Sequence, residues 1–226
     1  TQPIPNGTGD ALIRACQVLP KTKNVLVTYG DIPLIQPETL IKLMDQHVKL
    51  RAQITILTTS MGSNEGMGRI LRDSSNKIVS IIEEKETDTE TYKIAEVNAG
   101  IYCFDPIILE QILPTLSPTK NDEIYLTDVV SKSAKSHTIG SLSSNSSWET
   151  LGINNRVKLA EAETVLRSQI QKMWMEEGVT IIDPNSTYID LTAKLGKDTV
   201  ILPNTHLLGT TDIGTQCKIG PNTTIK

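Results

Sequence analysis

The sequence lacks an excess of positive charge, paired cysteines and long hydrophobic runs. Lys+Arg 22 against Asp+Glu 26 gives a formal net charge of -4, so it has no basic field of the kind that holds a nucleic-acid backbone. Three cysteines and three histidines lie far apart and lack zinc-ligand spacing. An odd cysteine count fits a reducing, cytoplasmic setting better than a disulfide framework. Any anionic ligand must therefore be bound by local geometry.

The sequence also lacks a membrane-spanning run, a signal peptide and an initiator methionine. The segment Thr1–Asn6 starts no element, and a repeating pattern is still running at Lys226. We expect the chain to be an internal piece of a longer protein.

Short apolar runs alternate with helical patterns from Gly7 to about Ser147, which is typical of a three-layer α/β domain. Val25–Tyr29 is predicted to be a strand buried on both faces. A helix is expected from Pro37 through His47, with proline and Glu38 in its first turn. The other expected elements are strands at Ile54–Leu57, Ile78–Ile82 and Val97–Phe104, with a hairpin turn at Ser74–Asn76.

A longer helical pattern follows from Asn154 to Glu177, and Gly178 ends it. One face is predicted to be apolar, with members at Leu159, Ala162, Leu166, Ile170 and Met173. Charged residues surround this face, so we interpret residues 154–178 as a half-solvated linker helix.

The last part of the chain has a six-residue period. Large aliphatic residues recur at Ile189, Leu195, Ile201, Leu207, Ile213, Ile219 and Ile225, each preceded two positions earlier by a small residue. Six is the period of hexapeptide β-helices, in which the large residue points into the core and glycine eases a corner. Chance alternation in a β-rich tail is the alternative, but seven members in register favour the solenoid. With three hexads per coil, residues 179–226 would hold roughly two coils.

Two segments carry candidate chemistry. Asn6-Gly7-Thr8-Gly9-Asp10 runs into a helix, where glycines and the helix N-terminus favour a phosphorylated ligand, although plain capping is the commoner role of such a turn. Tyr29-Gly30-Asp31 follows a strand, and ligands of open α/β sheets bind beyond the carboxyl ends of strands. Asp31 could hold Mg²⁺ there or simply begin a turn with Pro33.

Several blocks together resemble the bifunctional N-acetylglucosamine-1-phosphate uridyltransferase/glucosamine-1-phosphate acetyltransferase family. They occur in the family's order over essentially the whole chain. The blocks are Leu26–Ile35, Gly66–Ile70, Ile81–Lys85, Glu96–Ile101, Glu123–Asp128 and Leu151–Arg156, followed by the hexapeptide repeats.

The resemblance implies a site residue by residue. Gln2, Gly7 and Thr8 would face uracil and ribose, with Tyr29 and Gly30 on the nucleotide side. Asp31 and Asn154 would hold Mg²⁺. The N-acetylglucosamine-binding set would be Gly68, Glu83, Asn98, Tyr125 and Thr127. Asn98 at a strand edge and Tyr125 in the core are the structural alternatives.

The implied reaction is attack of the sugar-1-phosphate oxygen of N-acetylglucosamine-1-phosphate on the α-phosphorus of UTP, giving UDP-N-acetylglucosamine and pyrophosphate. The implied domains are an N-terminally incomplete nucleotidyltransferase (Rossmann-like) domain at 1–153, the linker helix at 154–178 and the truncated start of a left-handed β-helix at 179–226. The family's glycine-rich phosphate loop and its acetyltransferase coils are not in this sequence, so we expect no synthesis by this chain alone. The intact family member is expected to be a cytoplasmic bacterial homotrimer.

Two other functions stay open. One is a nucleotidyltransferase for another sugar-1-phosphate, such as glucose-1-phosphate. The other is a non-catalytic module that binds a sugar nucleotide or assembles subunits.

Overall fold

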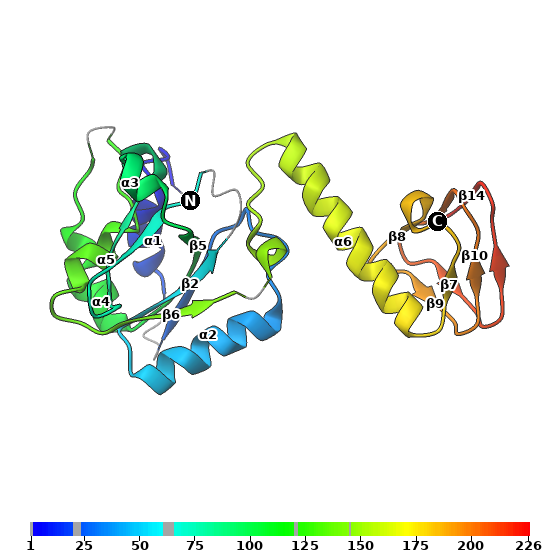
Figure 1. The fold of residues 1–226 in the computed structure, drawn as a ribbon, viewed down its shortest axis with the longest axis horizontal. Coiled ribbons are helices and arrows are strands. Elements are labelled where there is room, and N and C mark those ends of the chain that lie inside the picture. The colour runs from blue at the N-terminus through cyan, green and yellow to red at the C-terminus, as the bar shows by residue number, and fades with distance from the viewer. Residues whose placement is uncertain (1, 20–23, 61–65, 120–121, 145) are drawn as a thin grey trace. The chain divides into compact units, whose positions relative to one another are not determined.

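The computed structural model describes residues 2–19, 24–60, 66–119, 122–144 and 146–226 (Figure 1). The chain forms two compact units, Thr1–Gly152 and Ile153–Lys226. The helices of the first unit are α1 (Thr8–Cys16), α2 (Pro37–Leu50), α3 (Thr89–Tyr92), α4 (Pro106–Gln111) and α5 (Asp128–Ser133). Its strands are β1 (Val25–Thr28), β2 (Ile54–Ser60), β3 (Arg69–Arg72), β4 (Ile78–Ile82), β5 (Glu96–Phe104) and β6 (Ile139–Ser143).

The first unit is built on a mixed sheet in which β5 is the central strand. The sheet order is β4-β3-β5-β2-β6, and β1 also pairs with β5. β5 is antiparallel to β1, β2 and β3, whereas β2 and β6 run parallel. Every residue of β5 after Glu96 is buried. The strand that carries Asn98 is therefore fixed on both edges.

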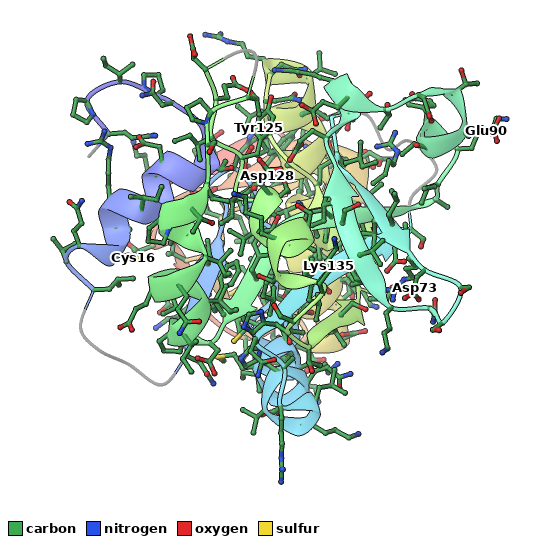
Figure 2. The ribbon with its side chains drawn as sticks, turned by 90° about the vertical axis from the view of Figure 1, so that its left-hand side faces the viewer. Cys16, Asp73, Glu90, Tyr125, Asp128 and Lys135 are labelled. Carbon is green, nitrogen blue, oxygen red and sulfur yellow. The ribbon has the colours of Figure 1, made fainter. Side chains whose placement is uncertain are left out.

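Helices cover both faces of this sheet, which confirms the three-layer prediction (Figure 1). Successive strand residues point to opposite faces, so Tyr102 and Phe104 pack with α1, α4 and α5, whereas Ile101 and Cys103 pack with Leu43 of α2. Figure 2 looks onto the side of the first unit that carries Tyr125 and Asp128.

The prediction for Val25–Tyr29 was partly wrong. A strand forms, but Val25, Leu26 and Val27 are only half-buried and Thr28 is exposed. The physical reason is that β1 pairs with β5 along one edge, and no other strand among the described residues pairs with it. The apolar composition of the run correctly predicted a strand but did not predict how far the strand is buried.

The other predicted elements of the first unit are confirmed. α2 begins with Pro37 and Glu38, and its backbone leaves the helix at Arg51 with a left-handed φ of 49°. The β3–β4 turn is closed by Asp73, whose Oδ1 accepts from the backbone N–H groups of Ser75 and Lys77.

The second unit begins with α6 (Arg156–Glu176), which Asn155 caps by accepting from the backbone N–H of Lys158. The predicted apolar face is only partly correct. Ala162 and Ile170 are buried, but the other three predicted members, Leu159, Leu166 and Met173, are exposed. Gly178, with a φ of 91°, ends the helical run as expected. Among the residues described, no helix is long and apolar enough to span a bilayer.

The six-residue period forms the predicted solenoid. Eight short strands pair in parallel in three sheets: β7 (Thr180–Ile181), β8 (Tyr188–Ile189), β9 (Lys194–Leu195), β10 (Val200–Ile201), β11 (Thr205–Leu207), β12 (Asp212–Ile213), β13 (Lys218–Ile219) and β14 (Thr223–Ile225). Ile201 pairs with Ile219, and Leu207 pairs with Ile225, one coil of three hexads further on. The predicted aliphatic residues form one cluster, buried as far as Leu207 and half-buried at Ile213 and beyond.

Candidate functional site

The predicted nucleotide side lies at an open cavity of about 650 Å³ between α1 and β1. Thr8 supplies one wall, and Tyr29, Gly30 and Asp31 supply the rim that follows β1. The rest of the lining is mainly apolar and comes from Ala11, Leu12, Ala15, Val27, Thr28 and Leu126. Four of the six predicted nucleotide-side residues are thus brought together, and a flat apolar ligand group would fit against the wall.

The start of α1 is fixed by the chain segment before α5. Thr8 Oγ1 accepts from the backbone N–H of Leu126 at 3.1 Å. Gly7 has a φ of 98°, and a Cβ there would lie 2.5 Å from the carbonyl oxygen of Ile124. Gly7 therefore allows the chain to approach another protein segment closely, a structural role of the kind that the sequence had left open beside the ligand role.

Gln2 is used inside the protein. Its Nε2 donates to the Gly7 carbonyl at 3.0 Å and to Asp10 Oδ2 at 2.6 Å. Arg14 also pairs with Asp10. The hydrogen bond from Arg14 and, to a smaller extent, the one from Gln2 lower the pKa of the Asp10 carboxyl. Gln2 braces the N-terminal turn of α1, and its Oε1 is the atom left for a ligand.

Asp31 has the properties of a metal-ligand candidate. Its side chain is exposed, and it forms no ion pair or side-chain hydrogen bond with any residue that the structure describes. Asn154 is also exposed, and it lies in the second unit directly before α6. The pairing of Asp31 with Asn154 stays a prediction. Within the described residues, no group of three or more His, Cys, Asp or Glu side chains could hold a metal.

The predicted sugar side contains a hydrogen-bonded carboxylate. Thr127 Oγ1 donates to Glu83 Oε1 at 2.6 Å. Burial raises the pKa of Glu83, and the Thr127 bond acts in the opposite direction. A carboxylate that is held on one oxygen and removed from water accepts strongly with the other. Glu83 is therefore suited to sugar hydroxyls.

Gly68 and Asn98 meet beside this carboxylate. The Asn98 backbone N–H donates to the Gly68 carbonyl at 2.8 Å. A Cβ on Gly68 would lie 2.8 Å from Ile81 Cγ2, which is too close, and 3.7 Å from Glu83 Oε2, which is an ordinary contact distance. The Asn98 side chain is buried, with Oδ1 accepting from the Gly100 N–H at 3.0 Å and Nδ2 donating to Tyr102.

Tyr125 lies at the edge of this group and is half-buried rather than part of the core. Its hydroxyl donates to Glu123, and that bond, with burial and other nearby carboxylates, raises its pKa to about 12. Burial likewise raises the pKa of nearby Asp128. Tyr125 is therefore a neutral donor at any physiological pH.

Tyr102 is a member of the site that the sequence interpretation missed. It is fully buried, its hydroxyl accepts from Asn98 Nδ2 at 2.6 Å, and its ring lies against that of Tyr29 with the centroids 6.3 Å apart. Burial raises its pKa well above the usual value. The sequence could have pointed to Tyr102, because Asn98, Gly100 and Tyr102 occupy every second position of a largely apolar strand and therefore share one face of it.

The two sides of the site influence each other. The charge of Glu83 raises the pKa of Tyr29, Tyr102 and Tyr125, in each case behind a larger effect of burial or hydrogen bonding. The Tyr29 ring packs over Gly100, where a Cβ would lie 2.5 Å from Tyr29 Cδ2. Gly100 has a φ of 72°, so both its backbone and its close approach require glycine.

Comparison with known families gives two matches. The model described as "Nucleotidyl transferase" matches residues 1–165, and "Bacterial transferase hexapeptide (six repeats)" matches residues 192–226. Among solved structures, a putative glucose-1-phosphate thymidylyltransferase from Bacillus anthracis superposes with a TM-score of 0.56 at 18% identity. It covers 71% of this chain and 61% of its own, and supports the fold.

Curated relatives include proteins named "Bifunctional protein GlmU". The one from Caldanaerobacter subterraneus subsp. tengcongensis is 42% identical over 99% of this chain and 49% of its own length. Those from Corynebacterium diphtheriae and Exiguobacterium sibiricum are 40% and 42% identical over 97% of this chain, and 46% and 50% of their lengths. The chain spans about half the length of the curated relatives it matches.

Proposed function

The chain belongs to the nucleotidyl transferase family, and on that basis we propose that it carries the sugar-binding and part of the nucleotide-binding machinery of a UDP-N-acetylglucosamine-forming uridyltransferase. The observation that carries the proposal is the meeting of three predicted sugar-side residues: Asn98 donates its backbone N–H to the Gly68 carbonyl, and Glu83 Oε2 would lie 3.7 Å from a Cβ at Gly68. Thr127 completes that group by its bond to Glu83. Asn98 donates to the Tyr102 hydroxyl, and the Tyr102 ring lies against that of Tyr29, which lines the cavity beside α1.

The donor and acceptor pattern suits an acetamido sugar. Asn98 has one amide N–H and one lone pair left after its internal bonds, which match the carbonyl and N–H of an N-acetyl group. Glu83 Oε2 is free to accept from a ring hydroxyl. The Tyr29–Asp31 rim lies where the uridine phosphates would run.

The residues present fit a divalent cation in part. Asp31 offers an unpaired, exposed carboxylate on the cavity rim, and Asn154 would offer an amide oxygen. Oxygen ligands of this kind suit Mg²⁺. A bound Mg²⁺ would neutralise charge on the phosphates. The protein's own part is positioning: it would hold the sugar phosphate in line with the α-phosphorus of UTP. A phosphate oxygen of the sugar phosphate then bonds to that phosphorus as the bond to the bridging α,β-oxygen breaks, so the uridylyl group is transferred and pyrophosphate leaves.

We also propose that the protein is a homotrimer in the bacterial cytoplasm. The solenoid offers a regular surface for self-association, and the three free cysteines are in keeping with a reducing compartment.

Calorimetric titration of the purified chain with UDP-N-acetylglucosamine and Mg²⁺ tests the proposal, with UDP-glucose and UDP as comparison ligands. We expect UDP-N-acetylglucosamine to bind at least about tenfold more tightly than UDP-glucose, because buried groups made for the acetamido group would otherwise be left unpaired. Equal binding of the two sugars would favour another sugar-1-phosphate as substrate. Absence of binding by all three ligands would favour an assembly module.

Thr127→Val provides the variant for the sugar side, and Thr127→Ser is its matched control. The valine variant removes the donor to Glu83 and should weaken UDP-N-acetylglucosamine binding about tenfold, whereas serine keeps the hydroxyl and should bind normally. Affinity for UDP should be the same in both. Unchanged sugar-nucleotide affinity in Thr127→Val would remove the Glu83 group from the sugar site.

A further inference from the structure

Arg69 is a buried arginine next to the predicted sugar side. It is the first residue of β3, and its backbone pairs with Ile82 of β4 on one side and with Val97 of β5 on the other. These two partners directly precede Glu83 and Asn98 in the sequence. The backbone of one arginine therefore adjoins both polar residues of the sugar side.

The Arg69 side chain is bonded at its edge and stacked on its face. It is only 1% exposed. Its Nη1 donates to the Met67 carbonyl, and its Nε donates to the Tyr92 carbonyl at 3.4 Å. The guanidinium carbon lies 4.8 Å from the centre of the Tyr92 ring. A planar guanidinium can use its edge and its face together in this way, whereas a lysine ammonium cannot.

The two carbonyls belong to the segments that carry the sugar-side residues. The Met67 carbonyl is in the peptide bond that enters Gly68, and the Gly68 carbonyl in turn accepts from the Asn98 N–H at 2.8 Å. The Tyr92 carbonyl is at the end of α3, on the segment that leaves Glu83. The guanidinium therefore connects the segment before β3 to the segment after β4.

A second bond joins the same two segments near the surface. Glu84 Oε2 accepts from the backbone N–H of Gly66. That bond is exposed, so water competes with it and its net contribution is small. The Arg69 contacts are buried, where a lost partner cannot be replaced by water. The spacing of the two segments therefore depends mainly on Arg69.

We propose that Arg69 is a positioning residue for the sugar side, an inference that rests on the proposed function. Its guanidinium holds the peptide that enters Gly68 and the end of α3 at a fixed separation, so that Glu83 and Asn98 keep the spacing that one sugar ring requires. Small displacements of such groups weaken the contacts they make. The cavity on the nucleotide side is lined by other residues, so UDP should bind independently of Arg69.

Arg69→Met tests the proposal, because it keeps much of the length of the side chain and removes its donors. We expect calorimetric titration to show UDP-N-acetylglucosamine binding about tenfold more weakly, since at least one buried hydrogen bond is lost, with UDP affinity unchanged. Arg69→Lys should give an intermediate loss, because it keeps the charge without the planar fork. Arg72→Met is the matched control: Arg72 is on the same strand but bonds to Glu96 and Asn76, and its loss should leave both affinities unchanged.

Tyr92→Leu is a second variant that keeps the proposal testable if Arg69→Met does not fold. Tyr92 is 50% exposed, so its replacement removes the ring against the guanidinium without opening the core. We expect it to weaken UDP-N-acetylglucosamine binding about threefold, the value of a modest cation–π contact.

A measurement without ligand separates this inference from the proposed function. In the ¹⁵N-labelled free chain, hydrogen exchange of the Asn98 backbone N–H should be several-fold faster in Arg69→Met, with exchange of the Cys103 N–H at the other end of β5 unchanged. If the wild-type chain binds no sugar nucleotide, the proposed function fails, and the Asn98 exchange rate decides whether Arg69 positions this strand. Wild-type affinity in Arg69→Met or Tyr92→Leu, an equal loss in Arg72→Met, or unchanged Asn98 exchange would overturn the inference.

Discussion

Ile201 offers the sharpest test of the solenoid register. Its side chain is fully buried, whereas that of Val200, its neighbour on the same two-residue strand, points away from the core and is half-buried. Ile201 lies between Ile181 and Ile219, and Val200 lies between Thr180 and Lys218. Replacing each of them with alanine removes a similar number of apolar side-chain atoms, but from opposite faces of one strand.

The expected costs differ by several-fold. Ile201→Ala loses buried apolar surface and leaves a cavity in a stack that cannot collapse freely, which typically costs about 2–5 kcal/mol. Val200→Ala loses only strand preference and partial burial, which should cost less than about 1 kcal/mol. Ile213→Ala should fall between them, because Ile213 is half-buried near the end of the stack.

Urea unfolding followed by the fluorescence of Trp174 reports on this unit, because Trp174 packs against the solenoid core. A Trp148→Phe background removes the only other tryptophan. With a slope of about 1–3 kcal/mol per M urea, Ile201→Ala should lower the midpoint by about 1 M or more, and Val200→Ala by less than half of that. Equal shifts in the two variants, or a larger one in Val200→Ala, would refute the register and the core derived from it.

Three further predictions concern other parts of the chain. Burial lowers the pKa of His47, so the unfolded state binds more protons than the folded state on acidification. The free energy of unfolding should therefore fall as pH drops from 7 through the folded pKa. His47→Gln should make that decline less steep when urea midpoints are measured against pH. Gly196→Ala should destabilise the solenoid by about 1–3 kcal/mol, because its Cβ would lie 2.4 Å from the backbone of Gly214, whereas Gly214→Ala meets only a sulfur at 3.9 Å and should be harmless in the same assay. Asp31→Ala should abolish Mg²⁺-dependent ligand binding while shifting the thermal midpoint little, since the side chain is exposed; Mg²⁺-dependence equal to wild type would exclude Asp31 as the ligand.

Most of the secondary-structure elements could be predicted from local sequence patterns. The hexapeptide register could be obtained from sequence because each coil repeats one environment, so a large residue at every sixth position has one place to go. The same holds for α2, whose first-turn Pro37 and Glu38 act within a few residues. The blocks that resemble the family likewise supplied a set of candidate site residues, since they concern residue types in order along the chain.

Burial was harder to obtain from sequence than element type. The apolar run at Val25–Thr28 forms a strand, but its burial depends on which strands flank it, and β5 alone does so among the described residues. On α6, Ala162 and Ile170 are buried while Leu159 is exposed. Periodicity fixes which residues share a face, but only the partner of that face determines how much of it is covered.

The sequence by itself therefore determined most of the elements and the solenoid register, because these follow from short-range spacing, and its resemblance to a known family supplied the candidate residues. Only the tertiary structure decided how those residues act together. Asn98 and Tyr29 both meet Tyr102, which no motif had singled out. The hydrogen bonds of these side chains and the raised pKa of Glu83 arise because atoms from distant segments meet away from water. Spacing along the chain does not predict which distant segments meet.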